Sequence, residues 1–169
     1  MFFTWWLRLF FVLIQTLRKP LVSLDEETTL NLRVWPFDAE LLAANHAAYA
    51  TYFEMGRWGY GAQIHMIPIF AKRVWAVIIG GQAFFYNKPM KRFQKFQVKT
   101  QLIAFDEKWL YFKQSIESKG AVIASARVRA LIRGTKGIIP TQTILSELGN
   151  PKIDLPTGEH WKAFKDLMT

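Results

Sequence analysis

The chain of 169 residues contains no cysteine, and no internal repeat or low-complexity tract is visible in it. The lack of cysteine excludes disulfides, thiolate metal ligands and cysteine nucleophiles together. It is compatible with a cytoplasmic setting. A chain of this length without repeats is expected to form one domain. Its hydrophobic content of 51% and aromatic content of 15% are ample for a buried core.

Acidic residues are scarce relative to basic ones: 13 Asp and Glu stand against 22 Lys and Arg, which gives a net charge of +9. Such a balance indicates a polyanionic partner or an anionic membrane surface. No nucleic-acid-binding motif is present. The 14 phenylalanines are better explained by core and acyl contacts than by base stacking, so no nucleic acid partner is expected.

The segment at residues 1–17, MFFTWWLRLFFVLIQTL, is strongly apolar and is followed by two basic residues. As a helix it would carry one narrow polar stripe, made of Thr4, Arg8, Gln15 and Lys19. A spanning helix needs about 20 residues, and a central arginine costs about 2.5–3.5 kcal/mol of insertion free energy. We therefore expect residues 1–19 to lie in the interface of an anionic membrane, with Arg8 reaching for headgroups.

Two other arrangements of this segment stay open. It could form a single weak span, or it could pack on the domain or on a dimer partner. A cleaved signal peptide is not expected, because the charges follow the apolar run and no small-x-small cleavage site is present.

The rest of the chain predicts an α+β architecture. Residues 28–35 alternate as a half-buried strand, and the small residues along 42–57 predict a helix that a sheet can approach closely. Four further strands are expected as a meander: 75–86, 93–104, 108–117 and 121–133. Gly80-Gly81 suggests a bulge in the first of these. Short helices are expected within 64–75, at 141–148 and at 158–168.

Residues 36–57, PFDAELLAANHAAYATYFEMGR, combine acidic, amide and imidazole side chains at one point of the chain. Asp38 and Glu40 follow the first strand, which Pro36 closes because proline cannot continue the hydrogen-bond ladder. His46, Tyr49 and Arg57 then share one helical face. Such a grouping is what general acid/base or nucleophilic chemistry requires.

This stretch resembles the signature of the hotdog-fold acyl-CoA thioesterases, the 4-hydroxybenzoyl-CoA thioesterase-like superfamily, in a bacterial membrane-associated branch. The matching residues are Asp38-Ala39-Glu40, His46-Ala-Ala-Tyr49 and Glu54-Met-Gly-Arg57. Residues 93–116 resemble the paired central strands of that branch, and 129–140 resemble its last strand and exit. The resemblance implies a hotdog domain at 28–149, with an antiparallel five-stranded sheet wrapped around the central helix. Residues 150–169 would form a tail.

The resemblance also implies roles for the polar residues. An acidic residue attacks the thioester or activates water, and Asp38 and Glu40 compete for this role. The D-x-D spacing favours Glu40, whereas a loop one residue shorter and the retained residue type favour Asp38, which we rank first. Asn45 and His46 would orient the thioester. The family usually carries H-M-N-N where this chain reads Ala44-Asn45-His46-Ala47.

Further residues are assigned to the substrate. Tyr49 would line the pocket, and Glu54 with Arg57 is expected as an ion pair. The basic turn at 88–95, with Lys91 and Arg92, would meet the phosphates of coenzyme A or serve as a solvated edge. An arginine row on the last strand, including Arg129, would bind phosphate or anionic lipid, or face solvent.

The function that the resemblance implies is hydrolysis of acyl-CoA or acyl carrier protein thioesters. Coenzyme A would enter as part of the substrate, and neither a metal nor another cofactor is expected. The alternative is a non-catalytic domain that binds acyl chains or lipids, and a hydratase on the same fold is a third option. Hotdog domains form homodimers or dimers of dimers with active sites at the interface. We expect this one at the cytoplasmic face of the inner membrane.

Overall fold

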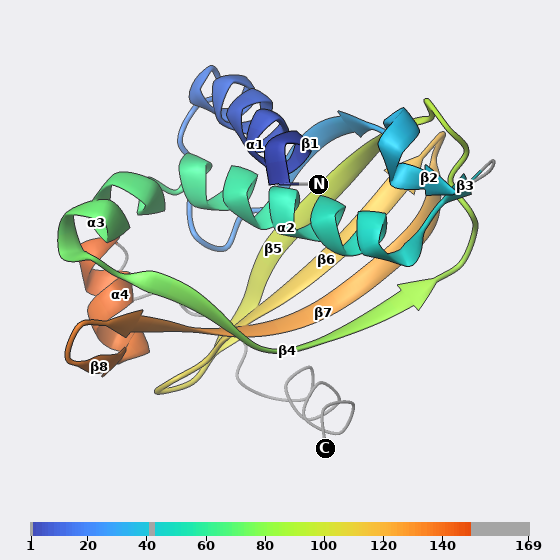
Figure 1. Ribbon diagram of the computed structural model, residues 1–169. Coiled ribbons are helices and arrows are strands. Elements are labelled where there is room, and N and C mark those ends of the chain that lie inside the picture. Colours follow the sequence, from blue (N-terminus) through green and yellow to red (C-terminus); the bar gives the residue numbers. More distant parts are fainter. Residues whose placement is uncertain (1, 41–42, 150–169) are drawn as a thin grey trace.

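The computed structural model describes residues 2–40 and 43–149 of the chain. Within them, six strands form an antiparallel sheet in the order β1-β5-β6-β7-β4, with β8 paired to β7 (Figure 1). The strands are β1 (Thr28–Arg33), β4 (Ala76–Tyr86), β5 (Lys95–Phe105), β6 (Leu110–Ser118), β7 (Ala121–Gly134) and β8 (Gly137–Ile139). The other elements are α1 (Phe2–Leu17), the one-turn helix η1 (Pro36–Asp38), the hairpin strands β2 (Ala39–Glu40) and β3 (Ala43–Ala44), α2 (His46–Gln63), α3 (Met66–Arg73) and α4 (Thr141–Glu147).

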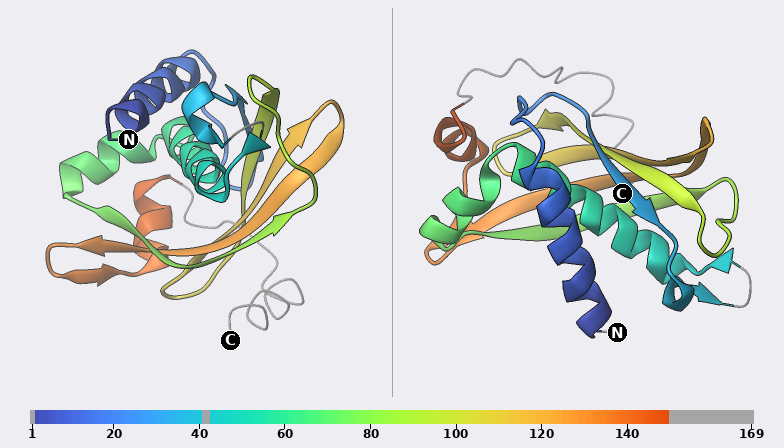
Figure 2. Two further views of the ribbon diagram at one scale, coloured as in Figure 1. Left: turned by 45° about the vertical axis from the view of Figure 1, so that its right-hand side comes forward. Right: turned by 90° about the horizontal axis from the view of Figure 1, so that it is seen from above.

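The sheet curls around α2, which lies against its concave face (Figures 1 and 2). Gly56 allows the close approach: a Cβ atom there would lie 2.6 Å from Val98 Cγ1 and 2.9 Å from Thr100 Oγ1. Below the helix, Gln114 donates to the backbone oxygen of Phe53 and to Thr100 Oγ1. These contacts satisfy polar groups that would otherwise be costly to bury. The predicted hotdog arrangement is confirmed.

The strand order differs from the predicted meander in one respect. Only β5, β6 and β7 follow one another, whereas β4 pairs with β7 at the sheet edge and β1 pairs with β5. The connection at 87–94 therefore crosses the end of the sheet. The bulge predicted at Gly80-Gly81 is confirmed between Ile79 and Gly81. The sheet has six strands rather than the predicted five, because residues 137–139, within the stretch expected as the exit from the last strand, pair with β7 as β8.

The short helices are confirmed as α3 and α4, while the helix predicted at 158–168 lies outside the described residues.

Helix α1 packs on the domain, across α2 and beside β1 (Figure 2). Its inward face buries Leu9, Val12 and Thr16. Arg8 is also buried, at 6% exposed, so the expectation that it reaches for headgroups is wrong. A charged side chain with an available carboxylate partner is more stable paired than unpaired at the helix–domain contact. Of the described helices, none is both long and apolar enough to cross a membrane.

The two edges of the sheet differ in how far other residues cover them. Along β1, the Gln15 side chain donates to the backbone oxygen of Asn31 and accepts from its N–H, and Lys19 donates to the oxygen of Thr29. Gln15 of α1 and Lys19, two residues after the helix, therefore cover part of this edge. The opposite edge strand, β4, exposes large apolar side chains, among them Ile78 and Phe85. An uncovered apolar edge is a surface for association with another strand.

Candidate active site

Asp38 ends η1, and its carboxylate is enclosed by three donors. Oδ2 accepts from Arg8 Nη2 at 2.6 Å, from the Tyr52 hydroxyl at 2.7 Å and from the backbone N–H of Trp35 at 2.9 Å. The guanidinium of Arg8 also lies 5.3 Å from the centre of the Trp35 ring and 5.2 Å from that of Tyr52. Asp38 is thus held in an ion pair that joins α1 to η1.

The hydroxyl of Tyr52 remains a donor in this arrangement. Burial raises the pKa of Tyr52, and the hydrogen bond to Asp38 raises it further. The phenol therefore keeps its proton near neutral pH, and the carboxylate keeps that hydrogen bond.

Glu40, two residues further on, is exposed and makes a different contact. Its Oε1 accepts from Asn45 Nδ2 at 3.0 Å. The other side-chain atom of Asn45, Oδ1, accepts from the backbone N–H of Ala48 at 2.9 Å, which makes Asn45 the N-cap of α2. The backbone N–H of Asn45 donates to the backbone oxygen of Asp38 at 3.0 Å. One amide side chain therefore caps the helix and holds a carboxylate beside its N-terminus.

The N-terminus of α2 offers hydrogen-bond donors beside Glu40. The N–H groups of the first turn have no partner within a helix, and Asn45 satisfies that of Ala48. The N–H groups of His46 and Ala47 precede it, at the positive end of the helix dipole. A developing oxyanion placed here would be stabilised by fixed donors.

A groove of about 810 Å³ runs beside this helix start, between α1 and α2. Asn45, Ala47 and Ala48 line it on one side, and Trp5 and Trp6 line it on the other. Thr4, Arg8, Phe37, Asp38 and Thr51 complete the lining. Its largely apolar walls suit an acyl or aryl group.

The basic turn predicted to meet phosphates lies next to the Glu40 hairpin. Ala43 of β3 forms an isolated bridge with Lys91, and the N–H of Ala44 donates to the backbone oxygen of Met90 at 2.8 Å. Lys91 and Arg92 are exposed. The structure therefore brings the predicted acidic corner and the predicted basic turn together.

His46 and Tyr49 lie on the side of α2 that faces the end of β4. Both line a recess of about 350 Å³ together with Tyr86 and Lys88. The hydroxyl of buried Tyr49 donates to the backbone oxygen of Lys88 and accepts from the N–H of Met90. Burial raises the pKa of Tyr49. Tyr49 thus anchors the connection that carries the basic turn, while His46 is exposed.

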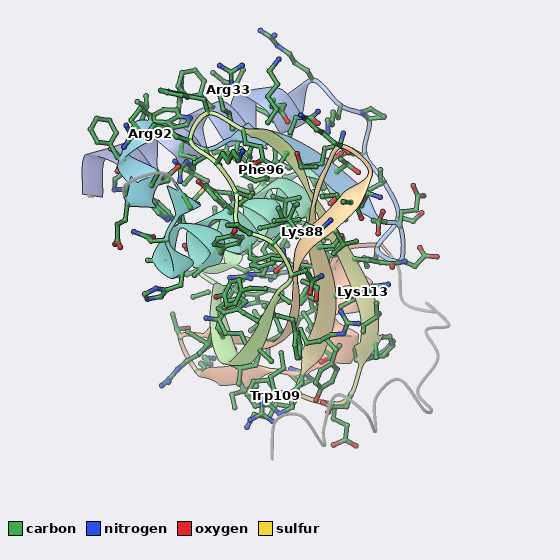
Figure 3. The ribbon with its side chains drawn as sticks, turned by 90° about the vertical axis from the view of Figure 1, so that its right-hand side faces the viewer. Arg33, Lys88, Arg92, Phe96, Trp109 and Lys113 are labelled. Atoms are coloured by element: carbon green, nitrogen blue, oxygen red, sulfur yellow. The ribbon has the colours of Figure 1, made fainter. Side chains whose placement is uncertain are left out.

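Arg129 is not brought to this site. It alternates along β7 with Val128 and Ala130, which are buried against α2, so it lies on the other face of the sheet. There its guanidinium lies 5.0 Å from the centre of the Trp109 ring, and its Nε donates to the backbone oxygen of Gly80. Figure 3 shows Trp109 and Lys113 away from Arg92.

The predicted ion pair between Glu54 and Arg57 is replaced by two separate hydrogen bonds. Glu54 accepts from Trp5 Nε1 at 3.2 Å, and Arg57 donates to Gln114 Oε1 at 2.8 Å. Burial lowers the pKa of Arg57 to about 10, and the nearby charge of Glu54 opposes that shift. Both residues contact neighbouring elements, which is why the helical spacing alone misassigned them.

Three residues that donate to Asp38 were not singled out as its partners from the sequence. They are Tyr52, Trp35 and Arg8, of which Arg8 was expected to reach for headgroups. A signal for Arg8 was present, because a lone charge in an apolar helix needs either water or a partner. Nothing in the sequence named Asp38 as that partner. Among the described residues, no group of three or more His, Asp or Glu lies close enough together to hold a metal ion.

Comparison with known proteins adds to this geometry. Residues 32–144 match the sequence family described as the thioesterase-like superfamily. The zebrafish (Danio rerio) protein THEM6 is 24% identical over 155 residues, which covers 87% of this chain and 74% of that protein.

Two solved structures share the fold. The 1,4-dihydroxy-2-naphthoyl-CoA thioesterase Slr0204 from Synechocystis has a TM-score of 0.64 at 10% identity, over 74% of this chain and 97% of its own. The DHNA-CoA thioesterase from Staphylococcus aureus has a TM-score of 0.65 at 15% identity, over 83% of this chain and 89% of its own.

Proposed function

Because this chain belongs to the thioesterase-like superfamily, we propose that it hydrolyses the thioester bond of an acyl-coenzyme A, with Glu40 as the reacting carboxylate. The observation that carries this proposal is the Glu40–Asn45 hydrogen bond, which holds a carboxylate beside the first N–H groups of α2. The similar folds from Synechocystis and Staphylococcus aureus are named as thioesterases of CoA esters, which supports the substrate class.

The choice of Glu40 over Asp38 rests on what each carboxylate already binds. Oδ2 of Asp38 accepts three hydrogen bonds, one from a guanidinium. Three donors on one oxygen, one of them a buried guanidinium, hold this carboxylate in a structural ion pair. Glu40 is exposed and accepts a hydrogen bond from a neutral amide. The ranking of Asp38 first, which rested on residue type, therefore gives way to Glu40.

The reaction follows from these positions. Glu40 takes a proton from a water molecule, and the oxygen of that water bonds to the thioester carbonyl carbon. The carbonyl oxygen becomes an oxyanion, which the N–H groups of His46 and Ala47 hold. When the tetrahedral intermediate collapses, the carbon–sulfur bond breaks and the thiolate takes the proton from Glu40. The products are a carboxylic acid and free coenzyme A.

The rest of the substrate is assigned to the flanking surfaces. The acyl or aryl group occupies the groove lined by Trp5, Trp6 and Phe37. The phosphates of coenzyme A meet Lys91 and Arg92, which lie beside β3.

We further propose that the protein is a homodimer joined through β4. The strand exposes Val77, Ile78, Ile79, Phe85 and Tyr86 by 38–49%. Antiparallel pairing of two copies of this edge would satisfy its free backbone groups and cover these side chains. The recess that holds His46 ends at Tyr86 of this strand, so the partner would complete that side of the site.

Purified full-length protein incubated with acetyl-, octanoyl-, palmitoyl- and benzoyl-CoA tests the proposal through release of free thiol. We expect turnover of at least one of these thioesters. Equilibrium binding of the same compounds is measured in parallel. Binding without turnover across the panel would reject hydrolysis and support the alternative, a non-catalytic acyl-binding domain.

One observation favours the alternative, a non-catalytic domain that binds acyl groups. The segment between the acids and Asn45 offers only Ala43 and Ala44 among its described residues. Where the resembling family usually carries H-M-N-N, this chain has alanine at 44 and 47, whereas the apolar groove is retained.

A further inference from the structure

We infer that the outer face of α1 and the basic groove beside it dock the protein onto an anionic lipid surface. This docking face consists of exposed apolar side chains on α1 and at η1, bordered by cations on β1, β5 and the β6–β7 turn. The inference does not depend on hydrolysis of any substrate. It also differs from the expected insertion, because Arg8 takes no part in it.

Helix α1 is amphipathic, and its polar stripe faces the domain. Arg8, Gln15 and Lys19 all bind groups of the domain: Asp38, Asn31 and Thr29 respectively. What remains outside is apolar. The exposed side chains are Trp6 at 53%, Phe10 at 58%, Phe11 at 53% and Leu17 at 78%. Contiguous apolar surface of this kind marks an interaction site.

A further aromatic side chain extends this surface beyond the helix. Phe37 of η1 is 80% exposed and borders the same groove as Trp5 and Trp6. Trp and Phe are the side chains that amphipathic helices place into the boundary between headgroups and acyl chains.

A basic groove borders the apolar face on the β1 side. It has a volume of about 760 Å³, and Phe11 shares its lining with Arg33, Lys95 and Lys119. Arg33 and Lys95 are directly opposite each other in the β1–β5 pairing. Like charges at opposite positions of a sheet cost stability, so an anion that binds between them would relieve a repulsion built into the fold.

The acidic residue of this groove does not offset these cations. Glu117 also lines it, but its carboxylate pairs with Lys99 at 2.9 Å. Figure 3 shows Arg33 and Arg92 at the end of the molecule over which α1 passes, whereas Lys113 lies lower on the sheet. Among the described residues, no carboxylate pairs with Arg33, Lys95 or Lys119, and these cations line the same groove as Phe11 of α1.

The charge of the docking face argues for lipid and against a second copy of this chain. In a symmetric contact, the same patch meets itself, so Arg33, Lys95 and Lys119 of the two copies would come together. Anionic headgroups attract such cations, by about a fivefold gain in partitioning for each one near the surface. The apolar β4 edge already offers a surface for self-association that lacks this repulsion.

Co-sedimentation of the full-length protein with phosphatidylcholine vesicles, with and without phosphatidylglycerol, tests the inference. We expect binding to the anionic vesicles that weakens as salt is raised. Phe10→Ser with Phe11→Ser should lower partitioning about tenfold or more. The matched control is Val74→Ser with Ile138→Ser, which removes exposed apolar side chains elsewhere and should leave partitioning unchanged.

The basic groove is tested separately with Arg33→Gln and Lys95→Gln, which should weaken binding about fivefold per cation. Lys113→Gln with Arg133→Gln makes the same change in net charge on the outer sheet face and should have little effect. Failure to bind anionic vesicles, or equal binding by all these variants, would overturn the inference. So would a smaller sedimenting mass for Phe10→Ser with Phe11→Ser in the absence of lipid, because the face would then join two copies of the chain.

Discussion

Asp38 and Glu40 are two residues apart in the chain but differ in what their carboxylates touch. Asp38 is enclosed by Arg8, Tyr52 and the backbone of Trp35. Glu40 is exposed and meets the N-cap amide of α2. The comparison teaches that, within one motif, an acid can be committed to holding elements together while its neighbour stays available for chemistry. Residue type does not decide between these roles, but the number and charge of the donors do.

The largest effect is expected for Glu40→Gln. The amide keeps the size of the side chain but cannot accept a proton from water, so kcat should fall by about 10²- to 10⁴-fold. The melting temperature should hardly change, because Glu40 is exposed. Thiol release and thermal unfolding measure the two quantities. The matched control, Glu107→Gln, changes an exposed acid in the β5–β6 turn and should retain full activity.

Asp38→Asn should act on stability instead. Removing the carboxylate leaves the buried Arg8 without its counter-ion, which should cost about 3–5 kcal/mol in the free energy of unfolding. Denaturant unfolding measures this loss, and at a temperature where the variant is folded its kcat should stay near that of the wild type. Adding Arg8→Met should recover most of the lost stability, because it removes the uncompensated charge. A double variant no more stable than Asp38→Asn would argue against the ion pair as the cause.

Asn45 connects the two regions, and two substitutions separate its roles. Asn45→Ala loses the cap and should destabilise the protein by about 1 kcal/mol. Asn45→Asp keeps a capping oxygen but cannot donate to Glu40. We therefore expect Asn45→Asp to retain stability while its kcat falls, and Asn45→Ala to lose both. If Asn45→Asp keeps full activity, the Glu40–Asn45 hydrogen bond has no part in catalysis.

The smallest effect is expected for Tyr52→Phe, which removes one of the three donors to Asp38. The loss should be about 0.5–1.5 kcal/mol in the free energy of unfolding, with no change in kcat. Tyr111→Phe is the matched control, because that hydroxyl also donates to a carboxylate, Asp106, far from the corner. A large loss of activity in Tyr52→Phe alone would move the chemistry from Glu40 to Asp38.

Much of the fold could be predicted from the sequence because its signals are local. The alternation along 28–35 predicts β1, and the small residues around Gly56 predict α2. Gly80-Gly81 predicts the bulge. The place of β4 at the sheet edge could not be predicted, because alternation gives the faces of a strand and not its neighbours. The short strand β8 was missed for the same reason: its pairing to β7 is not a property of its own residues.

The residues of the candidate site, like the elements of the fold, could be predicted only where the sequence signal is local. The acids, Asn45 and His46 were found because they cluster within one short stretch of the sequence. The partner of Asp38 was missed, since Arg8 is 30 positions away and its position in an apolar helix suggested headgroups instead. A contact of that kind depends on how α1 packs against the domain, which no local pattern encodes.

The most direct measurement is the ratio of kcat values for Asp38→Asn and Glu40→Gln on the best thioester of the panel. It is taken at a temperature where circular dichroism shows both variants to be folded. We expect Asp38→Asn to turn over like the wild type and Glu40→Gln to be slower by at least about 10²-fold. Turnover by Glu40→Gln together with an inactive, folded Asp38→Asn would contradict the assignment of the reacting carboxylate.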